Sequence, residues 1–141
     1  MGTLTVHLQV VGFLLMLLGL SHAFFNRFFE WDVELAGVSL FTRRVFFVHT
    51  FFVAMTVTMM GAFSLMFARA LVEPQPLSRA ILAGMVLFWG SRLVAQFTAY
   101  ESAIWRGDRF RTRMHVAFSM FWVYVTGTYG MALVWSLRQI G

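Results

Sequence analysis

The chain has 141 residues, of which 60% are hydrophobic and 12% are charged, and its mean hydropathy is +0.75. These values lie outside the usage of soluble globular domains and indicate an integral membrane protein. The absence of cysteine excludes disulfides, thiolate metal sites and cysteine nucleophiles. All eleven basic residues are arginines, so we interpret the net charge of +5 as a guide to topology and expect no nucleic-acid partner.

Four apolar segments are each long enough to cross a hydrocarbon core of about 30 Å, which takes about 20 helical residues. They are predicted at residues 4–24, 45–68, 78–102 and 113–136. The first segment has the apolar run of a signal peptide without its positively charged start, so we expect it to remain as a helix. Together the segments predict an all-α fold, an integral membrane four-helix bundle that forms a single domain over residues 1–141.

The connection at residues 24–44 combines aromatic clusters with three carboxylates and is too long and too apolar for an idle linker. We expect it to lie on the membrane surface, with a short amphipathic or re-entrant helix within residues 31–41. Two interpretations stay open, an interfacial anchor held by the aromatic side chains and a lid over a site. In the second, Glu30 or Glu34 is the counter-charge for Arg92 or for the arginines that end the loop.

The connections alternate between two faces of the membrane, and arginines are unequally divided between these faces. The face that holds the loops at residues 25–44 and 103–112 carries seven arginines, and the opposite face carries three. In a bacterium, the face with more arginine in its short loops is cytoplasmic. The expected location is therefore the bacterial inner membrane, with both termini outside the cytoplasm.

Each expected helix has one titratable side chain within about two turns of the end predicted to be cytoplasmic. These are His22, His49, Glu101 and His115. Imidazole and carboxyl groups transfer protons near neutral pH, so the four are candidate catalytic residues for acid–base chemistry. The fourth histidine, His7, lies near the opposite face and stands apart.

Arg92 lies in an apolar segment, where a central arginine costs about 2.5 to 3.5 kcal/mol on insertion scales and normally faces the bundle interior with a partner. Gln96 and Tyr100 follow it at steps of four residues, on one side of the helix. The fourth segment has a similar stripe: His115, Ser119, Trp122, Thr126 and Tyr129. We expect these stripes to face one another around a polar pocket. The alternative is a structural ion pair, or an arginine whose side chain reaches out to the membrane surface.

Glycines in the first and fourth apolar segments are expected to permit close approach of helix backbones. The first segment contains Gly12 and Gly19, and the fourth contains Gly127 and Gly130. Close packing of this kind is typical of membrane helices, because small residues at an interface let the backbones come together.

The preferred hypothesis is binding or transformation of a lipid-like substrate with an acyl, isoprenoid or quinone tail. Arg92 and Gln96 would hold an anionic or carbonyl head group, and the histidines with Glu101 would move a proton. The candidate substrate-binding residues are Arg92, Gln96, Tyr100, Trp122, Tyr129 and Glu34.

Two alternatives remain. One is a haem or a divalent metal held by His49 and His115, whose ligands would come singly from separate helices because the chain has no His-x-x-x-His and no Glu-x-x-His motif. The other is a non-catalytic membrane subunit or anchor that docks to a larger complex. The expected partners are membrane lipids and either another membrane protein or a second copy of the chain.

Overall fold

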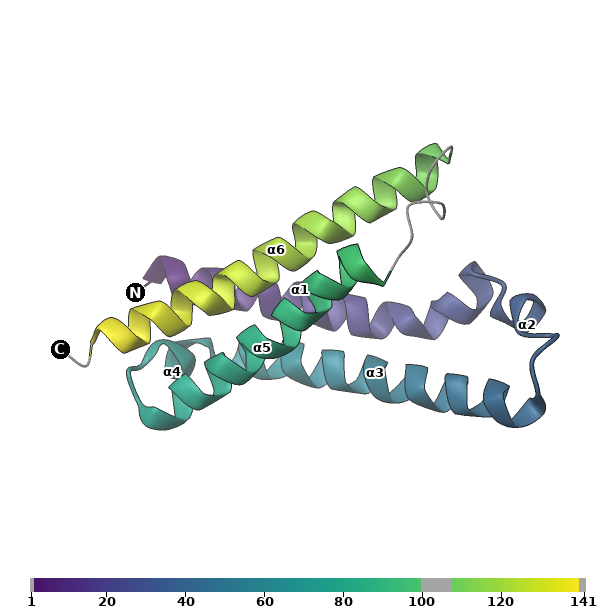
Figure 1. The fold of residues 1–141 in the computed structure, drawn as a ribbon. Helices are drawn as coiled ribbons and strands as arrows, with labels where there is room; N and C mark the ends of the chain where they lie inside the picture. The colour runs from purple at the N-terminus through teal and green to yellow at the C-terminus, as the bar shows by residue number, and fades with distance from the viewer. Residues whose placement is uncertain (1, 100–107, 140–141) are drawn as a thin grey trace. The chain divides into compact units, whose positions relative to one another are not determined.

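The computed structural model describes residues 2–99 and 108–139, and this part of the chain consists of helices and short connections without a strand (Figure 1). Its long helices are α1 (Gly2–Phe28), α3 (Leu40–Met66), α5 (Pro76–Thr98) and α6 (Arg109–Arg138), and its short ones are α2 (Trp31–Glu34) and α4 (Ala68–Val72). All four long helices are apolar enough to cross a membrane, which makes the chain an integral membrane protein. The predicted all-α class with four spanning helices is confirmed.

All four long helices begin earlier than their predicted segments, and the difference is largest in α3 and α6, where a polar side chain caps the first turn. α3 begins at Leu40, where the Ser39 hydroxyl accepts a hydrogen bond from a first-turn amide at 3.2 Å. α6 begins at Arg109, where the Asp108 carboxylate accepts from two first-turn amides at 2.8 and 3.1 Å. Such caps satisfy amides that have no partner within the helix.

The short helix predicted in the connection at residues 24–44 is α2, which has only four residues. Glu30 precedes it in a left-handed conformation with φ 50°, which turns the chain back after α1. The Asn26 amide donates to the Asp32 carboxylate at 3.1 Å. The Trp31 ring meets Phe46 of α3 edge to face, with 4.9 Å between ring centroids. These contacts attach the connection to both helices that it joins.

The described residues form two compact units, and α1 contributes to both. The α1–α3 unit is Leu8–Ala68, and the α5–α6 unit is Arg69–Gly141 together with Met1–His7. Each unit pairs two antiparallel helices, and each is described below by itself. The expectation of one domain stays a prediction.

In the α1–α3 unit the two helices meet at glycines. A Cβ atom added to Gly12 would lie 2.6 Å from the Leu65 backbone nitrogen and 2.7 Å from the Gly61 carbonyl oxygen. One added to Gly19 would lie 2.9 Å from the Ala54 carbonyl oxygen. These distances are too short for any side chain, so the close backbone approach predicted at Gly12 and Gly19 is confirmed.

In the α5–α6 unit the buried positions follow the spacing of a coiled coil. Those of α5 are Ser78, Leu82, Met85, Trp89 and Gln96, and those of α6 include Trp122, Val125, Tyr129, Ala132 and Ser136. Steps of three and four residues alternate along both helices, with half-buried Arg92 in the one longer gap. This 3.5-residue average keeps one stripe of each helix facing the other. Arg92 therefore lies at a helix–helix interface.

Hydrogen bonds fasten the opposite end of this unit, where α4 leads into α5. Arg79 donates through Nε to the Ser136 hydroxyl at 3.3 Å and through Nη2 to the Pro74 carbonyl oxygen at 2.9 Å. The Ser78 hydroxyl donates to the Ala70 carbonyl oxygen at 2.9 Å. Polar partners at this end satisfy groups that the apolar packing would otherwise leave unpaired.

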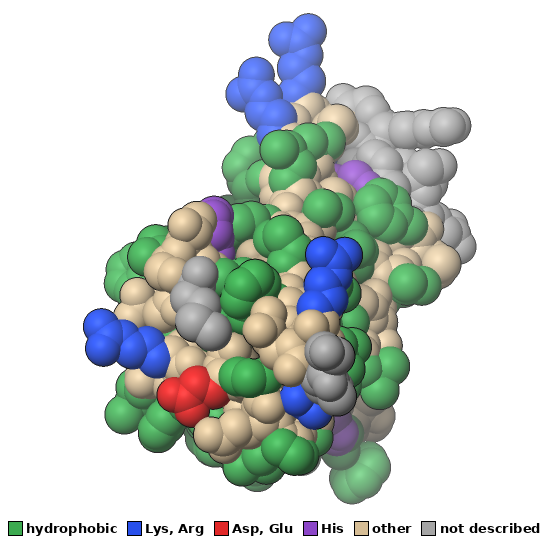
Figure 2. Space-filling model, turned by 90° about the vertical axis from the view of Figure 1, so that its left-hand side faces the viewer, with side chains coloured by type: hydrophobic (Ala, Val, Ile, Leu, Met, Phe, Trp, Pro, Cys, Tyr) green, Lys and Arg blue, Asp and Glu red, His purple; other side chains and the backbone are tan. Residues whose placement is uncertain are grey.

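The exposed surface carries many large hydrophobic side chains, some of which are visible in green on the face drawn in Figure 2. Phe41 is 78% exposed and Leu87 is 73% exposed. Such a surface suits contact with lipid. On α6, a Cβ at Gly127 or Gly130 would meet no described atom within 4 Å, so the close approach predicted at these two glycines is not found in the described part.

Candidate functional site

Arg92 contacts two side chains that the sequence also singled out. It lies on α5, six residues before the helix ends at Thr98. Its Nη1 donates to the Gln96 amide oxygen at 3.1 Å, and its Cζ lies 4.7 Å from the centroid of the Trp122 ring on α6. A guanidinium over an indole is a cation–π contact, which is stronger when it is shielded from water. Arg92 is thus held from its own helix and from α6.

Gln96 links Arg92 to His115, because its amide nitrogen lies 2.8 Å from Nδ1 of the imidazole. Arginine can only donate hydrogen bonds, so the amide oxygen of Gln96 must face Arg92 and the NH₂ group must face His115. An amide NH₂ can only donate, so Nδ1 of His115 accepts. This arrangement selects the neutral imidazole with its proton on Nε2.

Aromatic rings surround these polar groups. Trp122 stacks on Trp89 with 5.4 Å between ring centroids and on Phe118 with 6.1 Å. The Phe97 ring meets His115 edge to face at 6.0 Å. We call Trp89, Arg92, Gln96, His115 and Trp122 the Arg92 cluster.

Two buried indole donors in the Arg92 cluster lack an acceptor among the described residues. Trp89 is 1% exposed and Trp122 is 4% exposed, and in the described part of the chain neither indole Nε1–H has an acceptor. Buried N–H groups almost always find a partner, so two neighbouring ones without a partner require a physical explanation. The chemistry of the cluster therefore suits a ligand atom that accepts, such as a carbonyl, carboxylate or phosphate oxygen.

The other residues predicted for this site do not belong to the Arg92 cluster. Tyr129 is fully buried at the α5–α6 interface, two turns beyond Trp122. Ser119, which belonged to the predicted stripe, donates its hydroxyl to the His115 carbonyl oxygen at 2.8 Å, within its own helix. Tyr100 and Glu101 lie outside the described residues.

The α1–α3 unit holds His22, His49 and Glu34. Nδ1 of His22 bonds to the Leu18 carbonyl oxygen at 2.8 Å, and Nδ1 of His49 bonds to the Val45 carbonyl oxygen at 2.8 Å. A carbonyl oxygen only accepts, so each Nδ1 carries a proton and each Nε2 points away from this hydrogen bond. In the described part of this unit, no hydrogen bond or ion pair joins the two histidines and Glu34 to one another.

These tautomers bear on the haem and metal hypotheses. A histidine whose Nδ1–H is bound to a carbonyl oxygen offers Nε2 as a ligand, which describes His22 and His49. His115 is arranged differently, because its Nδ1 accepts from Gln96. Across residues 2–99 and 108–139, no three His, Asp or Glu side chains gather closely enough to hold a metal ion. The His49–His115 haem pair joins residues of two units and stays a prediction.

One polar pair was missed by the sequence analysis. Nδ1 of His7 lies 2.9 Å from the Tyr124 hydroxyl, and both residues belong to the α5–α6 unit. The two residues are 117 positions apart, and Tyr124 falls outside the polar stripe of its segment. No local pattern in the sequence could have indicated this contact.

Comparison of the chain with protein-family models, with curated proteins and with solved structures finds no match. The function is therefore argued from the residues and their geometry. In the Arg92 cluster, a cation and two buried indole donors lie together in one apolar helix pair.

Proposed function

We propose that this protein is a small polytopic protein of the bacterial inner membrane that binds a lipid-like molecule through the Arg92 cluster. The observation that carries the proposal is the pair of buried Nε1–H donors of Trp89 and Trp122, which have no acceptor among the described residues. The Arg92 guanidinium lies over the Trp122 ring, so a cation is close to these donors. A carbonyl or anionic head group would supply the acceptor atoms. Its acyl, isoprenoid or quinone tail would lie along the hydrophobic helix surface.

The tautomer of His115 supports a particular role for that residue. With Nδ1 accepting from Gln96, the neutral imidazole has Nε2–H as its donor. In this tautomer His115 is a hydrogen-bond donor within the Arg92 cluster. Proton transfer that involves His22, His49 or Glu101 is a further part of the hypothesis, and the Arg92 cluster supports binding more directly than catalysis.

Nuclear magnetic resonance of the detergent-solubilised protein tests this proposal. With ¹⁵N-tryptophan the five indole N–H groups give separate signals, and Trp89→Phe and Trp122→Phe assign two of them. We expect both signals to shift on addition of laurate or of a short-chain quinone, because each N–H gains an acceptor. Dodecyltrimethylammonium, which has the same tail length as laurate and a cationic head, is the control and should leave them unchanged. Spectra that stay constant at saturating laurate and quinone would contradict the proposal.

A second candidate is a non-catalytic subunit that docks other membrane helices. It is favoured by an open groove of 500 Å³ along α5, in which Ser91 and Ala95 have the small-xxx-small spacing of helix interfaces. Because the chain has no cysteine, Ser91→Cys or Ala95→Cys introduces a unique thiol for disulfide cross-linking in membranes. A homodimer or a heavier adduct that Gly84→Cys does not give would support docking at this groove. Monomer alone from all three variants would argue against it.

A further inference from the structure

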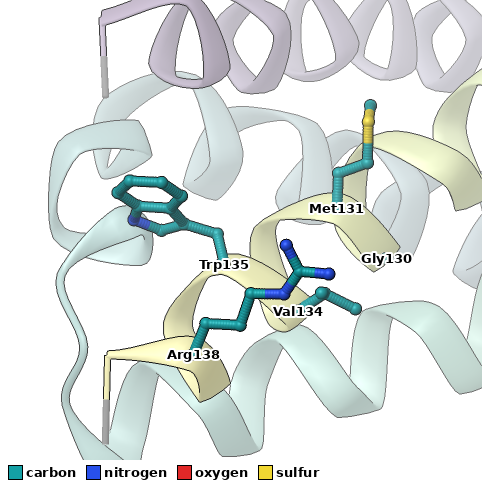
Figure 3. Close-up of a pocket in the computed structure, with 5 residues that line it drawn as sticks. All are labelled: Gly130, Met131, Val134, Trp135 and Arg138. Carbon is teal, nitrogen blue, oxygen red and sulfur yellow. The ribbon is translucent and has the colours of Figure 1, made fainter. Parts of the chain in front are cut away.

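A separate hollow lies on α6, away from the Arg92 cluster. It measures 420 Å³, is open to the outside, and is lined by Gly130, Met131, Val134, Trp135 and Arg138 (Figure 3). Gly130 leaves the space, because a Cβ there would meet no described atom within 4 Å. All five residues come from the last three turns of one helix, so the hollow is a groove along α6.

The groove is apolar along its length and cationic at one end. Met131 and Val134 line it with aliphatic side chains, and in Figure 3 the Arg138 side chain extends beside Val134. Arg138 is exposed, and no carboxylate or other acceptor contacts its guanidinium in the described part of the chain. An unpaired guanidinium at a helix end is suited to bidentate binding of a phosphate.

The surroundings add positive charge at this end of the α5–α6 unit. Arg79 donates to the Ser136 hydroxyl, two residues before Arg138 in α6, so a second guanidinium belongs to the same end of the unit. The nearby carboxylate of Glu73 accepts a hydrogen bond from the Gln75 side chain at 3.1 Å. Trp135 is of the type that gathers at the boundary between hydrocarbon and head groups.

We propose that the groove on α6 is a binding site for an anionic phospholipid. One acyl chain lies over Gly130 and against Met131 and Val134, and the phosphate contacts Arg138. The apolar floor requires a hydrocarbon tail, and the guanidinium favours a head group with net negative charge. The site is independent of the Arg92 cluster, so either proposal can fail without the other.

Quenching of tryptophan fluorescence by brominated acyl chains tests the site in detergent–lipid micelles. The contribution of Trp135 is the quenching that Trp135→Phe removes. We expect dibromo-phosphatidylglycerol to quench Trp135 at about fivefold lower mole fraction than dibromo-phosphatidylcholine, since one basic residue near the surface favours anionic lipid by about that factor. Trp89 and Trp122 are buried and should contribute little to the difference.

Two variants separate the tail from the head group. Gly130→Leu fills the groove and should abolish quenching of Trp135 by both lipids, whereas Arg138→Gln should retain quenching and lose the preference for phosphatidylglycerol. Gly84→Leu, at an exposed glycine of α5 with open space around it, is the matched control and should behave like the wild type. Equal quenching by the two lipids in the wild type, or quenching that Gly130→Leu leaves intact, would overturn the proposal. If Gly130→Leu does not fold, Gly130→Ala with Arg138→Gln provides the same comparison.

Discussion

The amide nitrogen of Gln96 lies 2.8 Å from Nδ1 of His115, and this contact determines which imidazole nitrogen carries the proton. The orientation of the amide is itself fixed by Arg92, which donates to the amide oxygen at 3.1 Å. A guanidinium on α5 therefore controls the tautomer of a histidine on α6, because each link has a donor with no capacity to accept. A change at any of the three residues should be detectable at the other two.

Gln96→Glu should reverse the tautomer of His115. A carboxylate only accepts, so Nδ1 must become the donor, whereas the wild type should show Nε2 protonated. The measurement is ¹⁵N chemical shifts of the imidazole in ¹⁵N-histidine-labelled protein. Gln96→Met, which has a similar length and no amide, is the control and should show no fixed tautomer. A wild-type spectrum with the proton on Nδ1 would refute the assignment.

Arg92→Leu should reduce the free energy of unfolding by about 1 to 3 kcal/mol, since it removes a cation–π contact and a charge-assisted hydrogen bond. Arg92→Lys should fall between this variant and the wild type, because an ammonium keeps the charge and loses the planar face that lies on Trp122. Unfolding by sodium dodecyl sulfate in mixed micelles measures both. In a double-mutant cycle with Trp122→Leu we expect a coupling of about 0.5 to 2 kcal/mol. Additive effects would show that the contact contributes no stability.

Gly12→Ala and Gly61→Ala should each lower stability by about 1 to 3 kcal/mol, because the new methyl group would press on backbone atoms of the facing helix. Gly84→Ala changes the same residue type in open space and should be neutral or stabilising by up to about 1 kcal/mol. Thermal unfolding in detergent distinguishes the two outcomes. Equal effects at all three positions would mean that α1 and α3 are not in close contact.

Asp108→Ala should fray the start of α6 and cost about 0.5 to 2 kcal/mol, because two first-turn amides lose their acceptor. The carboxylate also pairs with Arg111 at 3.3 Å, an exposed contact that adds little. Hydrogen exchange of the Phe110 and Arg111 amides should accelerate in Asp108→Ala and remain slow in Asp108→Asn, which retains a capping oxygen. Unchanged exchange in the alanine variant would contradict the role of this cap.

Both termini are expected to lie outside the cytoplasm, because the loops predicted to be cytoplasmic carry seven arginines and the opposite face carries three. Alkaline phosphatase fused to either end should be active in a bacterial host, and a fluorescent protein that matures only in the cytoplasm should be dark. The reverse pattern of reporter activity would show that both termini lie in the cytoplasm. If the arginines determine the orientation, moving them from the loops of one face to those of the other should reverse it.

The number and type of helices could be predicted from the sequence because hydropathy reports burial in lipid. The ends of the helices were harder to predict from hydropathy, because a helix can extend beyond the hydrocarbon core. Residues 40–44 and 109–112 are helical although they are partly polar, and the caps at Ser39 and Asp108 determine where each helix begins. This correction also changes the depth of His49, which lies nine residues, or about 13 Å, after the start of α3 at Leu40, whereas the sequence placed it within about two turns of that start.

The phase of the α6 stripe was only partly predicted. The polar residues suggested positions 115, 119, 122, 126 and 129, whereas the buried ones include 122, 125 and 129 with Phe118 stacked on Trp122. Both sets share Trp122 and Tyr129. Val125 is buried as well, while the predicted Thr126 is half-buried and its methyl group lies 3.9 Å from where a Cβ on Gly90 of α5 would be. In a membrane, the side of a helix that faces lipid and the side that faces another helix are both apolar. Polarity therefore does not identify the helix–helix interface as it does in a water-soluble protein. Contacts between helices, such as that of Gln96 with His115, depend on which sides of the helices meet, so they could be identified only in the structure.

The glycines of α1 and α3 also limit how these two helices can move. Gly12 and Gly19 are seven residues apart, so the backbone contacts recur every two turns. A slide of one helix along the other by less than this repeat would drive a side chain into backbone, and the next permitted register is about 10 Å away. Close packing at these glycines therefore opposes sliding of α1 along α3, whereas a rotation or tilt of the two helices together preserves the contacts.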